Sequence, residues 1–437
     1  MSNFNEMIKK PYFIYYKIDD EAMAWNSEDN TINKVSMDVV YSDKYKNYAM
    51  MKKAGYPSTK EGLQDFVNAF HKYQKELEDN DILCINWFQY RNNNGAVLLT
   101  YNRLANKKNE KPINHEHIGK IESLWMLKCY RAGIRTIDDK YLNKRVMSYS
   151  YDFRLCHPTC LSHRHLLIPT KSGKEITLSQ LPDINNIETG YYHVDIQCND
   201  PQFRKLFSFS DENVYTDRSL YHAMKHQQEF NVKINIIQDG HPNAYTYDKS
   251  CLVSGKRLFG NWFSYMIKLK KRFKSNFLVK FLASSLSGQL SKSKYVWKTE
   301  EEVEKENIKF DLSRNEKYYL INYLPDTGKF KFGVSEDPFV NNIRFKPFMT
   351  AFMRNKVARV AFTDLKHCFR VFEDSISFIK PQTFNLVDLV SEEKTSGLCI
   401  YSSTVKQKGS DELFQYIKEH DKEFYNALVT ITSLKTY

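Results

Sequence analysis

The sequence lacks several features that would assign it to whole classes of protein. No uncharged apolar run approaches the ~18–20 residues that a membrane-spanning helix requires. Residues 1–10 are too polar for a signal peptide, and the eight cysteines are scattered without a CxxC pair or an evident disulfide framework. Internal repeats and low-complexity segments are missing as well. We therefore expect an intracellular chain in a reducing compartment, neither secreted nor attached to a membrane.

The composition indicates a folded and basic protein. Hydrophobic residues make up 42% of the 437 residues and aromatic residues 14%, which argues against a disordered chain. At ~100–200 residues per domain, the length predicts two or three domains. The 64 Lys and Arg exceed the 52 Asp and Glu, giving a net charge of +12. A polyanionic partner such as nucleic acid would explain this surplus, and so would a solvated basic surface without a partner.

Hydrophobic periodicity predicts a mixed order of strands and helices. Strands are expected at 12–18, 82–87, 146–153, 191–197 and 232–237, with a hairpin at 369–372 and 376–379. Helices are expected at 63–77, 118–132, 258–272, 276–290, 345–367 and 410–428, the one at 345–367 being amphipathic. Loops are expected at 91–95 and 106–117, and the charged stretch 292–317 is expected to be an exposed connector.

Three local features could carry chemistry. Asp152 ends a predicted strand, Lys280 lies on a predicted helix behind a basic segment, and Asp374 lies at the hairpin tip. Taken singly, a cap, a solvated face and a turn explain them. Taken together, two carboxylates on adjacent strands can hold two Mg²⁺ ions ~3.5–4 Å apart, and a facing lysine can neutralise a triphosphate. The three residues therefore predict a phosphoryl-transfer site.

The order and spacing of these features resembles the family B DNA polymerases, particularly the protein-primed branch found in viruses, linear plasmids and self-synthesising transposons. Residues 152–158 are similar to the palm motif Asp-x-x-Ser-Leu-Tyr-Pro, and 280–288 to Lys-x-x-x-Asn-Ser-x-Tyr-Gly. Residues 370–375 are similar to Tyr-x-Asp-Thr-Asp-Ser, and 348–354 to the helix that precedes that motif. The resemblance covers roughly residues 150–400.

The resemblance implies a role for each matched residue. Asp152 and Asp374 would be the catalytic metal ligands for two Mg²⁺ ions, for which Mn²⁺ can substitute. The nucleotide-binding candidates implied in the same way are Lys280, Arg272, Lys268, His157 and Ser284. Lys268 and Arg272 are four residues apart on one helical face, and His157 replaces the tyrosine that discriminates sugars. The chain departs from the motifs also at Leu155, Cys156, Ser287, Phe372 and Glu373, where the family has other residues.

The resemblance also implies an α+β right-hand polymerase with an antiparallel-sheet palm, helical fingers, a small thumb and a mixed α/β N-terminal exonuclease-like domain. The expected divisions are 1–145 (degenerate exonuclease-like or template-guiding), 146–255 (palm, first part), 256–291 (fingers), 292–385 (palm, second part) and 386–437 (thumb). The N-terminal domain is expected to be degenerate, because the acidic run 19–21 fits an exonuclease motif but Arg91 stands where a second motif needs an acid.

The function implied is template-directed addition of deoxynucleotides, a nucleotidyltransferase reaction, in the replication of a viral or mobile genome. The expected partners are primer-template DNA, deoxynucleoside triphosphates and a terminal priming protein, without a membrane. A viral protein would act in the host cytoplasm or nucleus.

Three alternatives remain open. The motif departures are compatible with a catalytically inactive relative. Cys156, Cys160, His163 and His165 are zinc-type ligands, although their spacing, C-x₃-C-x₂-H-x-H, is not a familiar finger pattern. A basic, aromatic-rich chain could also bind single-stranded nucleic acid without chemistry.

Overall fold

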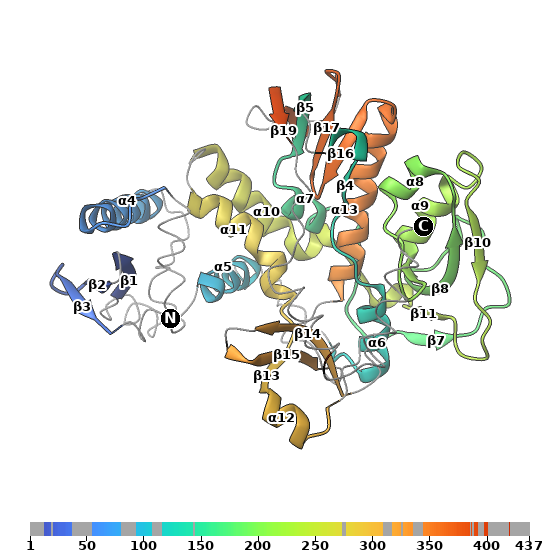
Figure 1. Ribbon diagram of the computed structural model, residues 1–437, viewed down its shortest axis with the longest axis horizontal. Coiled ribbons are helices and arrows are strands. Elements are labelled where there is room, and N and C mark those ends of the chain that lie inside the picture. Colours follow the sequence, from blue (N-terminus) through green and yellow to red (C-terminus); the bar gives the residue numbers. More distant parts are fainter. Residues whose placement is uncertain are drawn as a thin grey trace. The chain divides into compact units, whose positions relative to one another are not determined.

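The structure of the protein is a computed structural model with a mixed arrangement of helices and antiparallel strands (Figure 1). It describes residues 13–18, 21–36, 55–79, 93–106, 116–142, 145–272, 277–308, 317–324, 327–334, 344–384, 386, 389–391, 397–400 and 419. The chain forms two compact units, one of residues 1–113 with 259–289 and the other of 114–258 with 290–437. The predicted mixed α/β class with antiparallel sheets is confirmed. The predicted division into palm, fingers and thumb stays a prediction.

The first unit combines a small sheet with helices. Strands β1 (Phe13–Ile18), β2 (Glu21–Asn26) and β3 (Ile32–Val35) form an antiparallel sheet in that order. Trp25 of β2 is buried against α4 (Lys60–Asp79), where its ring contacts His71 with centroids 5.5 Å apart. The unit also contains α5 (Asn93–Asn106), α10 (Gly255–Arg272) from Phe259 onward, and α11 (Phe277–Leu290). Stacked rings of Tyr101 and Phe259 join α5 to α10.

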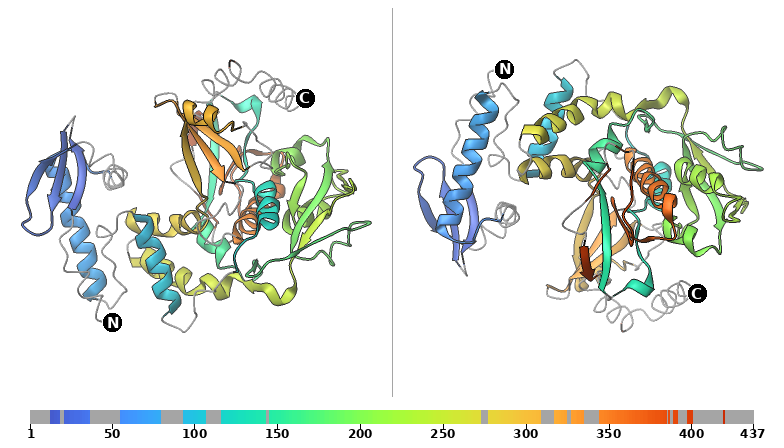
Figure 2. Two further views of the ribbon diagram at one scale, coloured as in Figure 1. Left: turned by 90° about the horizontal axis from the view of Figure 1, so that it is seen from below. Right: turned by 90° about the horizontal axis from the view of Figure 1, so that it is seen from above.

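The second unit contains a six-stranded antiparallel sheet with the order β18-β5-β17-β16-β4, in which β19 also pairs with β5. Its strands are β4 (Arg135–Ile137), β5 (Arg145–Phe153), β16 (Cys368–Phe372), β17 (Ser375–Phe378), β18 (Leu389–Ser391) and β19 (Gly397–Ile400). Helix α13 (Phe345–Ala361) packs against β16 and β17 (Figures 1 and 2). Val371, Ile376 and Phe378 are completely buried in this core.

Helix α13 begins at the predicted residue but differs from the prediction in character. It ends at Ala361, and a short 3₁₀ turn, η5 (Phe362–Asp364), follows it. The expected amphipathic pattern is wrong, because most of the helix is buried and even Arg354 is only 6% exposed. The Arg354 guanidinium donates to the carbonyls of Arg131 and Ala132 at 2.8 and 3.0 Å, and these hydrogen bonds offset the cost of burying its charge.

A second sheet and its helices form a separate core within the same unit. The sheet order is β10-β8-β11-β7, with β9 also paired to β8. Val194, Phe203 and Leu220 are completely buried in its core. The elements of this region are β7 (Lys174–Ile176), β8 (Gly190–Gln197), α8 (Pro201–Leu206), β9 (Val214–Thr216), α9 (Asp217–Lys225), β10 (Lys233–Ile236) and β11 (Ala244–Thr246). The unit also contains several short elements: α6 (Lys120–Cys129), η2 (Asp139–Tyr141), α7 (Cys156–Leu161), η3 (Lys249–Cys251), and the paired strands β6 (Leu167–Pro169) and β12 (Leu252–Ser254).

The expected exposed connector at 292–317 is wrong over much of its length. Strand β13 (Tyr295–Thr299) joins β15 (Lys329–Val334) and β14 (Tyr318–Leu324) in a three-stranded sheet, and α12 (Glu300–Lys305) follows β13. Thr299 and Glu302 form a reciprocal capping box that starts the helix. Val303 then enters the core with Phe330 and Phe332, so a single buried residue anchors an otherwise charged helix.

Other expectations have mixed outcomes. The predicted loop at 91–95 is wrong from Asn93 onward, because α5 begins there. The predicted strand at 82–87 lies outside the described residues, as does nearly all of 410–428. Most of the predicted loop at 106–117 is also outside them. Among the described helices, none is long and apolar enough to cross a bilayer.

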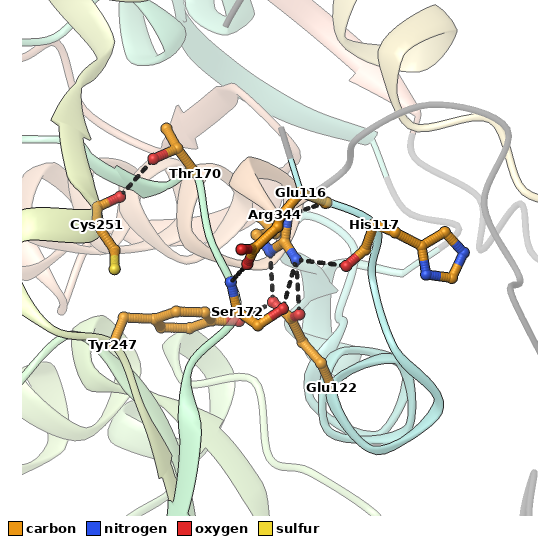
Figure 3. Close-up of polar contacts among 8 residues, drawn as sticks. All are labelled: Glu116, His117, Glu122, Thr170, Ser172, Tyr247, Cys251 and Arg344. Carbon is orange, nitrogen blue, oxygen red and sulfur yellow. Dashed lines mark hydrogen bonds and ion pairs between the residues drawn. The ribbon is translucent and has the colours of Figure 1, made fainter. Parts of the chain in front are cut away.

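A buried ion pair fixes the start of α13 (Figure 3). Arg344 has no exposed surface, and its Nε and Nη2 atoms contact the Glu122 carboxylate at 2.5 and 2.8 Å. The guanidinium also donates to the carbonyls of Glu116 and His117 at 2.7 and 3.2 Å. The Tyr247 hydroxyl donates to Glu122 at 2.8 Å. The pair therefore ties α13 to α6 and to the segment that precedes it.

Candidate active site

Two aspartates that are distant in the sequence occupy neighbouring positions of the six-stranded sheet. Asp152 of β5 lies directly opposite Ser375 of β17 in the antiparallel register. Asp374 immediately precedes Ser375, and its carbonyl accepts the backbone N–H of Phe153 at 3.1 Å. Residues opposite each other in such a pair have Cα atoms ~4.5–5.5 Å apart. Asp152 and Asp374 therefore start from adjacent backbone positions, and both residues are half-buried.

The register aligns further residues on the same face of the sheet as Asp152. Ser375 pairs with Phe372 of β16, and Phe372 pairs with Arg135 of β4, so the row runs across four strands. The Arg135 and Arg370 guanidiniums lie 5.1 and 4.9 Å from the centroid of the Phe372 ring. Two cations thus stand on the face that carries Asp152, at a distance suited to cation–π attraction.

The sequence did not reveal these two arginines. Arg370 is the first residue of the hairpin motif, yet nothing in that motif assigns it a role. Arg135 lies in a strand of three residues whose pairing with β16 is long-range, so no local pattern indicates it. Only the register of the finished sheet brings the two side chains together.

The turn that carries Asp374 is held in an unusual conformation. The backbone of Glu373 has φ +57°, a left-handed conformation that residues other than glycine rarely adopt. Its N–H donates to the Ile134 carbonyl at 2.7 Å, and its carboxylate forms an ion pair with Arg135, whose Nε lies 3.1 Å away. A Cβ at Gly133 would come within 3.1 Å of the Glu373 Cα. The missing side chain at Gly133 lets β4 approach and fix the turn.

His157 lies within electrostatic reach of Asp374. Leu155, with φ +49°, turns the chain from β5 into α7, which places His157 in the first turn of that helix. Burial lowers the pKa of His157, and the Asp374 and Glu373 carboxylates oppose this shift. His157 is therefore mainly neutral at pH 7. The pKa of Cys156 is raised well above its usual value, first by a hydrogen bond to Cys160, then by burial, with a smaller contribution from Asp374.

Helix α13 brings two lysines toward the same region. The Lys356 ammonium lies 4.4 Å from the centroid of the Phe153 ring and lowers the pKa of Cys156. Lys346 lowers the pKa of His157, while burial lowers the pKa of Lys346 itself. Lys346 also lines a cavity of about 270 Å³ together with Tyr130. Helix α13 therefore places positive charge near Phe153 and His157, residues that adjoin the aspartates in the sheet and in α7.

The other predicted nucleotide contacts belong to the first unit. Lys268 and Arg272 are exposed one helical turn apart near the end of α10. Ser284 is exposed on α11, and Lys280 lies one turn before it, with a side chain outside the described residues. Their approach to the aspartates stays a prediction.

The zinc alternative is not supported by the arrangement of its four ligands. Cys156 and Cys160 are buried in α7, whereas His163 contacts His165 and Phe352 with ring centroids 5.4 and 4.8 Å apart. Within the part of the chain that the structure describes, no three His, Cys, Asp or Glu residues are grouped to hold a metal ion. Asp152 and Asp374 supply only two carboxylates, which is the small number that Mg²⁺ takes when substrate phosphates fill its other positions.

The exonuclease-like expectation for the N-terminal block stays a prediction. Glu21 forms an exposed ion pair with Lys34 at 2.6 Å. Asp19, Asp20 and the segment 86–91 lie outside the described residues.

No family model matches the sequence, and no curated protein matches it. Among solved structures, Phi29 DNA polymerase complexed with single-stranded DNA is similar over 68% of this chain and 49% of its own length, with 14% identity and a TM-score of 0.46. The ternary complex of Phi29 DNA polymerase with primer-template DNA and incoming nucleotides gives 14% identity, a TM-score of 0.43 and coverage of 68% and 50%. The chain thus spans about half the length of these polymerases. At these values the likeness establishes neither the family of this chain nor its activity.

Proposed function

We propose that the protein is a template-directed DNA polymerase that adds deoxynucleotides to a primer hydroxyl. The observation that carries the proposal is the register that sets Asp152 of β5 beside the Asp374 turn. Paired carboxylates on adjacent strands are the protein part of a two-metal phosphoryl-transfer site. In the proposed role the chain acts in replication of a viral or mobile genome, on primer-template DNA and deoxynucleoside triphosphates, with a terminal protein as the priming partner.

Asp152 and Asp374 would hold Mg²⁺, and Mn²⁺ could replace it. The two residues suit a metal ion because both are half-buried carboxylates, and Asp374 contributes to the raised pKa of Cys156 and opposes the burial that lowers the pKa of His157. When bound, the two ions supply charge neutralisation at the phosphates and activate the attacking hydroxyl. No third acid is required of the protein, since substrate oxygens complete the coordination.

The remaining residues would bind and orient the substrates. Arg370 stands on the face of Asp152, where its guanidinium can bind a backbone phosphate of the primer-template, while Arg135 pairs with Glu373 and holds the Asp374 turn. Neutral His157, near Asp374, would contact the sugar of the incoming nucleotide. In this proposal Lys280, with Lys268, Arg272 and Ser284, contributes to binding the triphosphate.

A second candidate is a nucleic-acid-binding relative without catalysis. It is favoured by one observation, the ion pair that engages the Glu373 carboxylate with Arg135. The hairpin tip then offers a single carboxylate, Asp374, where the resembling motif has two acids.

A Mg²⁺-dependent primer-extension assay separates the two candidates. We expect extension by the wild type and its loss in Asp152→Asn and Asp374→Asn. Asp183→Asn serves as the matched control, because Asp183 is an exposed aspartate of the same unit and should leave extension unchanged. Tight primer-template binding without extension by the wild type at any Mg²⁺ or Mn²⁺ concentration would favour the second candidate and overturn the first.

A further inference from the structure

The three-stranded sheet β13-β15-β14 has one covered face and one open face. Directly paired residues of an antiparallel sheet project to the same side. Phe330 and Phe332 of β15 point into the core that also contains Val303 of α12, so the helix covers that side (Figure 1). Their neighbours Lys329 and Lys331 consequently project from the other side. The residues paired with Lys329, Lys331 and Gly333 therefore lie on the open face.

Aromatic and basic side chains gather on the open face. Trp297 pairs with Lys331, Tyr295 pairs with Gly333, and Asn322 pairs with Lys331 from the other strand. We call this surface the aromatic face and define it by Tyr295, Trp297, Asn322, Lys329 and Lys331; Tyr319 projects to the same side but is only 8% exposed. Tyr295 is 44% exposed and Trp297 40%, which leaves a large part of each ring open to a ligand.

The geometry of the face combines a stacking surface with a cation. The rings of Tyr295 and Trp297 meet edge to face with centroids 6.1 Å apart. The Lys331 ammonium lies 4.1 Å from the centroid of Tyr295 and 5.7 Å from that of Trp297, so cation–π attraction holds the charge beside both rings. A Cβ at Gly333 would lie 2.2 Å from the Tyr319 ring, so the glycine leaves room for the buried Tyr319 ring next to the exposed pair.

The charge of the sheet selects the kind of ligand. None of the strands β13, β14 and β15 contains an acidic residue, whereas four glutamates lie on α12, which covers the opposite side. The open face is therefore positive as well as aromatic. Exposed rings next to lysines suit single-stranded nucleic acid, because every base has a face that can stack and every nucleotide carries a phosphate.

We propose that the aromatic face binds single-stranded nucleic acid by stacking bases on Trp297 and Tyr295 and by placing a phosphate at Lys331. The site does not require chemistry at the carboxylates. Asp374→Asn, which should abolish extension, is expected to retain binding at the aromatic face, so failure of this inference and failure of the proposed polymerase activity are distinguishable.

The first test measures binding of a fluorescein-labelled oligothymidylate to the full chain by anisotropy. We expect Trp297→Ala to raise the Kd about tenfold, which corresponds to the loss of one stacked base. Trp297→Phe, which keeps a ring, should change it by less than about threefold. Ile321→Ala is the matched control, because Ile321 is an exposed apolar residue of the same sheet outside the aromatic face and should leave the Kd unchanged. Equal Kd values for the wild type and Trp297→Ala would overturn the proposal.

Lys331→Met tests the phosphate contact separately. Loss of one phosphate contact should reduce the slope of log Kd against log salt by about 0.7. An unchanged slope would refute the role of Lys331.

Photocrosslinking of the wild type needs no variant. An oligothymidylate that contains 5-iodouracil is expected to crosslink to the peptide carrying residues 295–297. Crosslinks confined to other peptides would overturn the proposal and assign the aromatic face to a different partner, such as a protein.

Discussion

Replacing Arg344 by methionine should loosen the second unit strongly, because it removes one partner of a fully buried ion pair. Arg344 has no exposed side-chain surface and Glu122 only 2%, and two short contacts join them. Deleting one partner of such a pair costs about 3–5 kcal/mol, since the remaining charge stays buried without compensation. With 1.36 kcal/mol for each factor of ten, the open form becomes on the order of 100- to 5,000-fold more populated.

Hydrogen–deuterium exchange of peptides from α6 and α13 measures this opening in the intact chain. Exchange in Arg344→Met should accelerate by the factor above. Glu229→Gln is the control, because Glu229 is 57% exposed in its ion pair with His226 and should cost less than about 1 kcal/mol. Adding Glu122→Gln to Arg344→Met removes the orphaned charge, keeps an acceptor for the Tyr247 hydroxyl and should restore part of the protection. Wild-type exchange rates in Arg344→Met would refute the reasoning.

Three further perturbations test other parts of the molecule. Burial raises the pKa of Asp217 from 3.8 to about 6, and its Oδ1 has no hydrogen-bond partner among the described residues. The folded state therefore holds its proton longer than the unfolded state, so stability should fall by about 3 kcal/mol as pH rises from 3.8 to about 6. Asp217→Asn should flatten this fall in urea midpoints taken between pH 4 and 7, and an unaltered pH profile would speak against it. Lys280→Ala should raise the nucleotide KM in primer extension more than it weakens DNA binding, whereas equal losses would count against a triphosphate contact. Gly133→Ala should lower the extension rate about three- to tenfold by displacing the Glu373 turn, with unfolding midpoints near those of the wild type; normal extension would show that the turn tolerates the shift.

Local patterns predicted the hairpin and β5, because each lies in a short apolar run bounded by turn residues. Two strands with a turn between them were expected at 369–372 and 376–379, which placed Ser375 in the turn. The structure shortens the turn by one residue, because Ser375 begins β17 and pairs with Phe372. The family resemblance led us to expect Asp152 and Asp374 close together, and the pairing of Asp152 with Ser375 places their backbones side by side. Their catalytic role remains a proposal.

Two predictions that were based on charged residues are wrong: the exposed connector over much of 292–317 and the amphipathic character of the helix at 345–367. Helix α12 has four glutamates, yet it packs on the sheet through the buried Val303, a hydrogen bond from Tyr323 to Glu300 and a capping box at its start. In α13 the charged Arg354 is buried because backbone carbonyls of another segment accept its hydrogen bonds. The residues that contact Val303 and Arg354 are distant in the sequence, so a local pattern could not predict these contacts. The same applies to Arg135, whose strand is defined by its pairing with β16.

This chain has Phe372 where the resembling motif has an aspartate, and the difference changes the charge on the Asp152 face of the sheet. An acidic side chain at this position would pair with Arg135 and Arg370 and use up their charge. Phe372 instead holds both guanidiniums over its ring, where Arg135 pairs with Glu373 and Arg370 adds a second cation on the face of Asp152. This arrangement favours nucleic-acid binding whether or not Asp152 and Asp374 hold metal. Primer-template binding is therefore expected of the active enzyme and of an inactive relative alike, so the decisive comparison is extension by the wild type against Asp374→Asn.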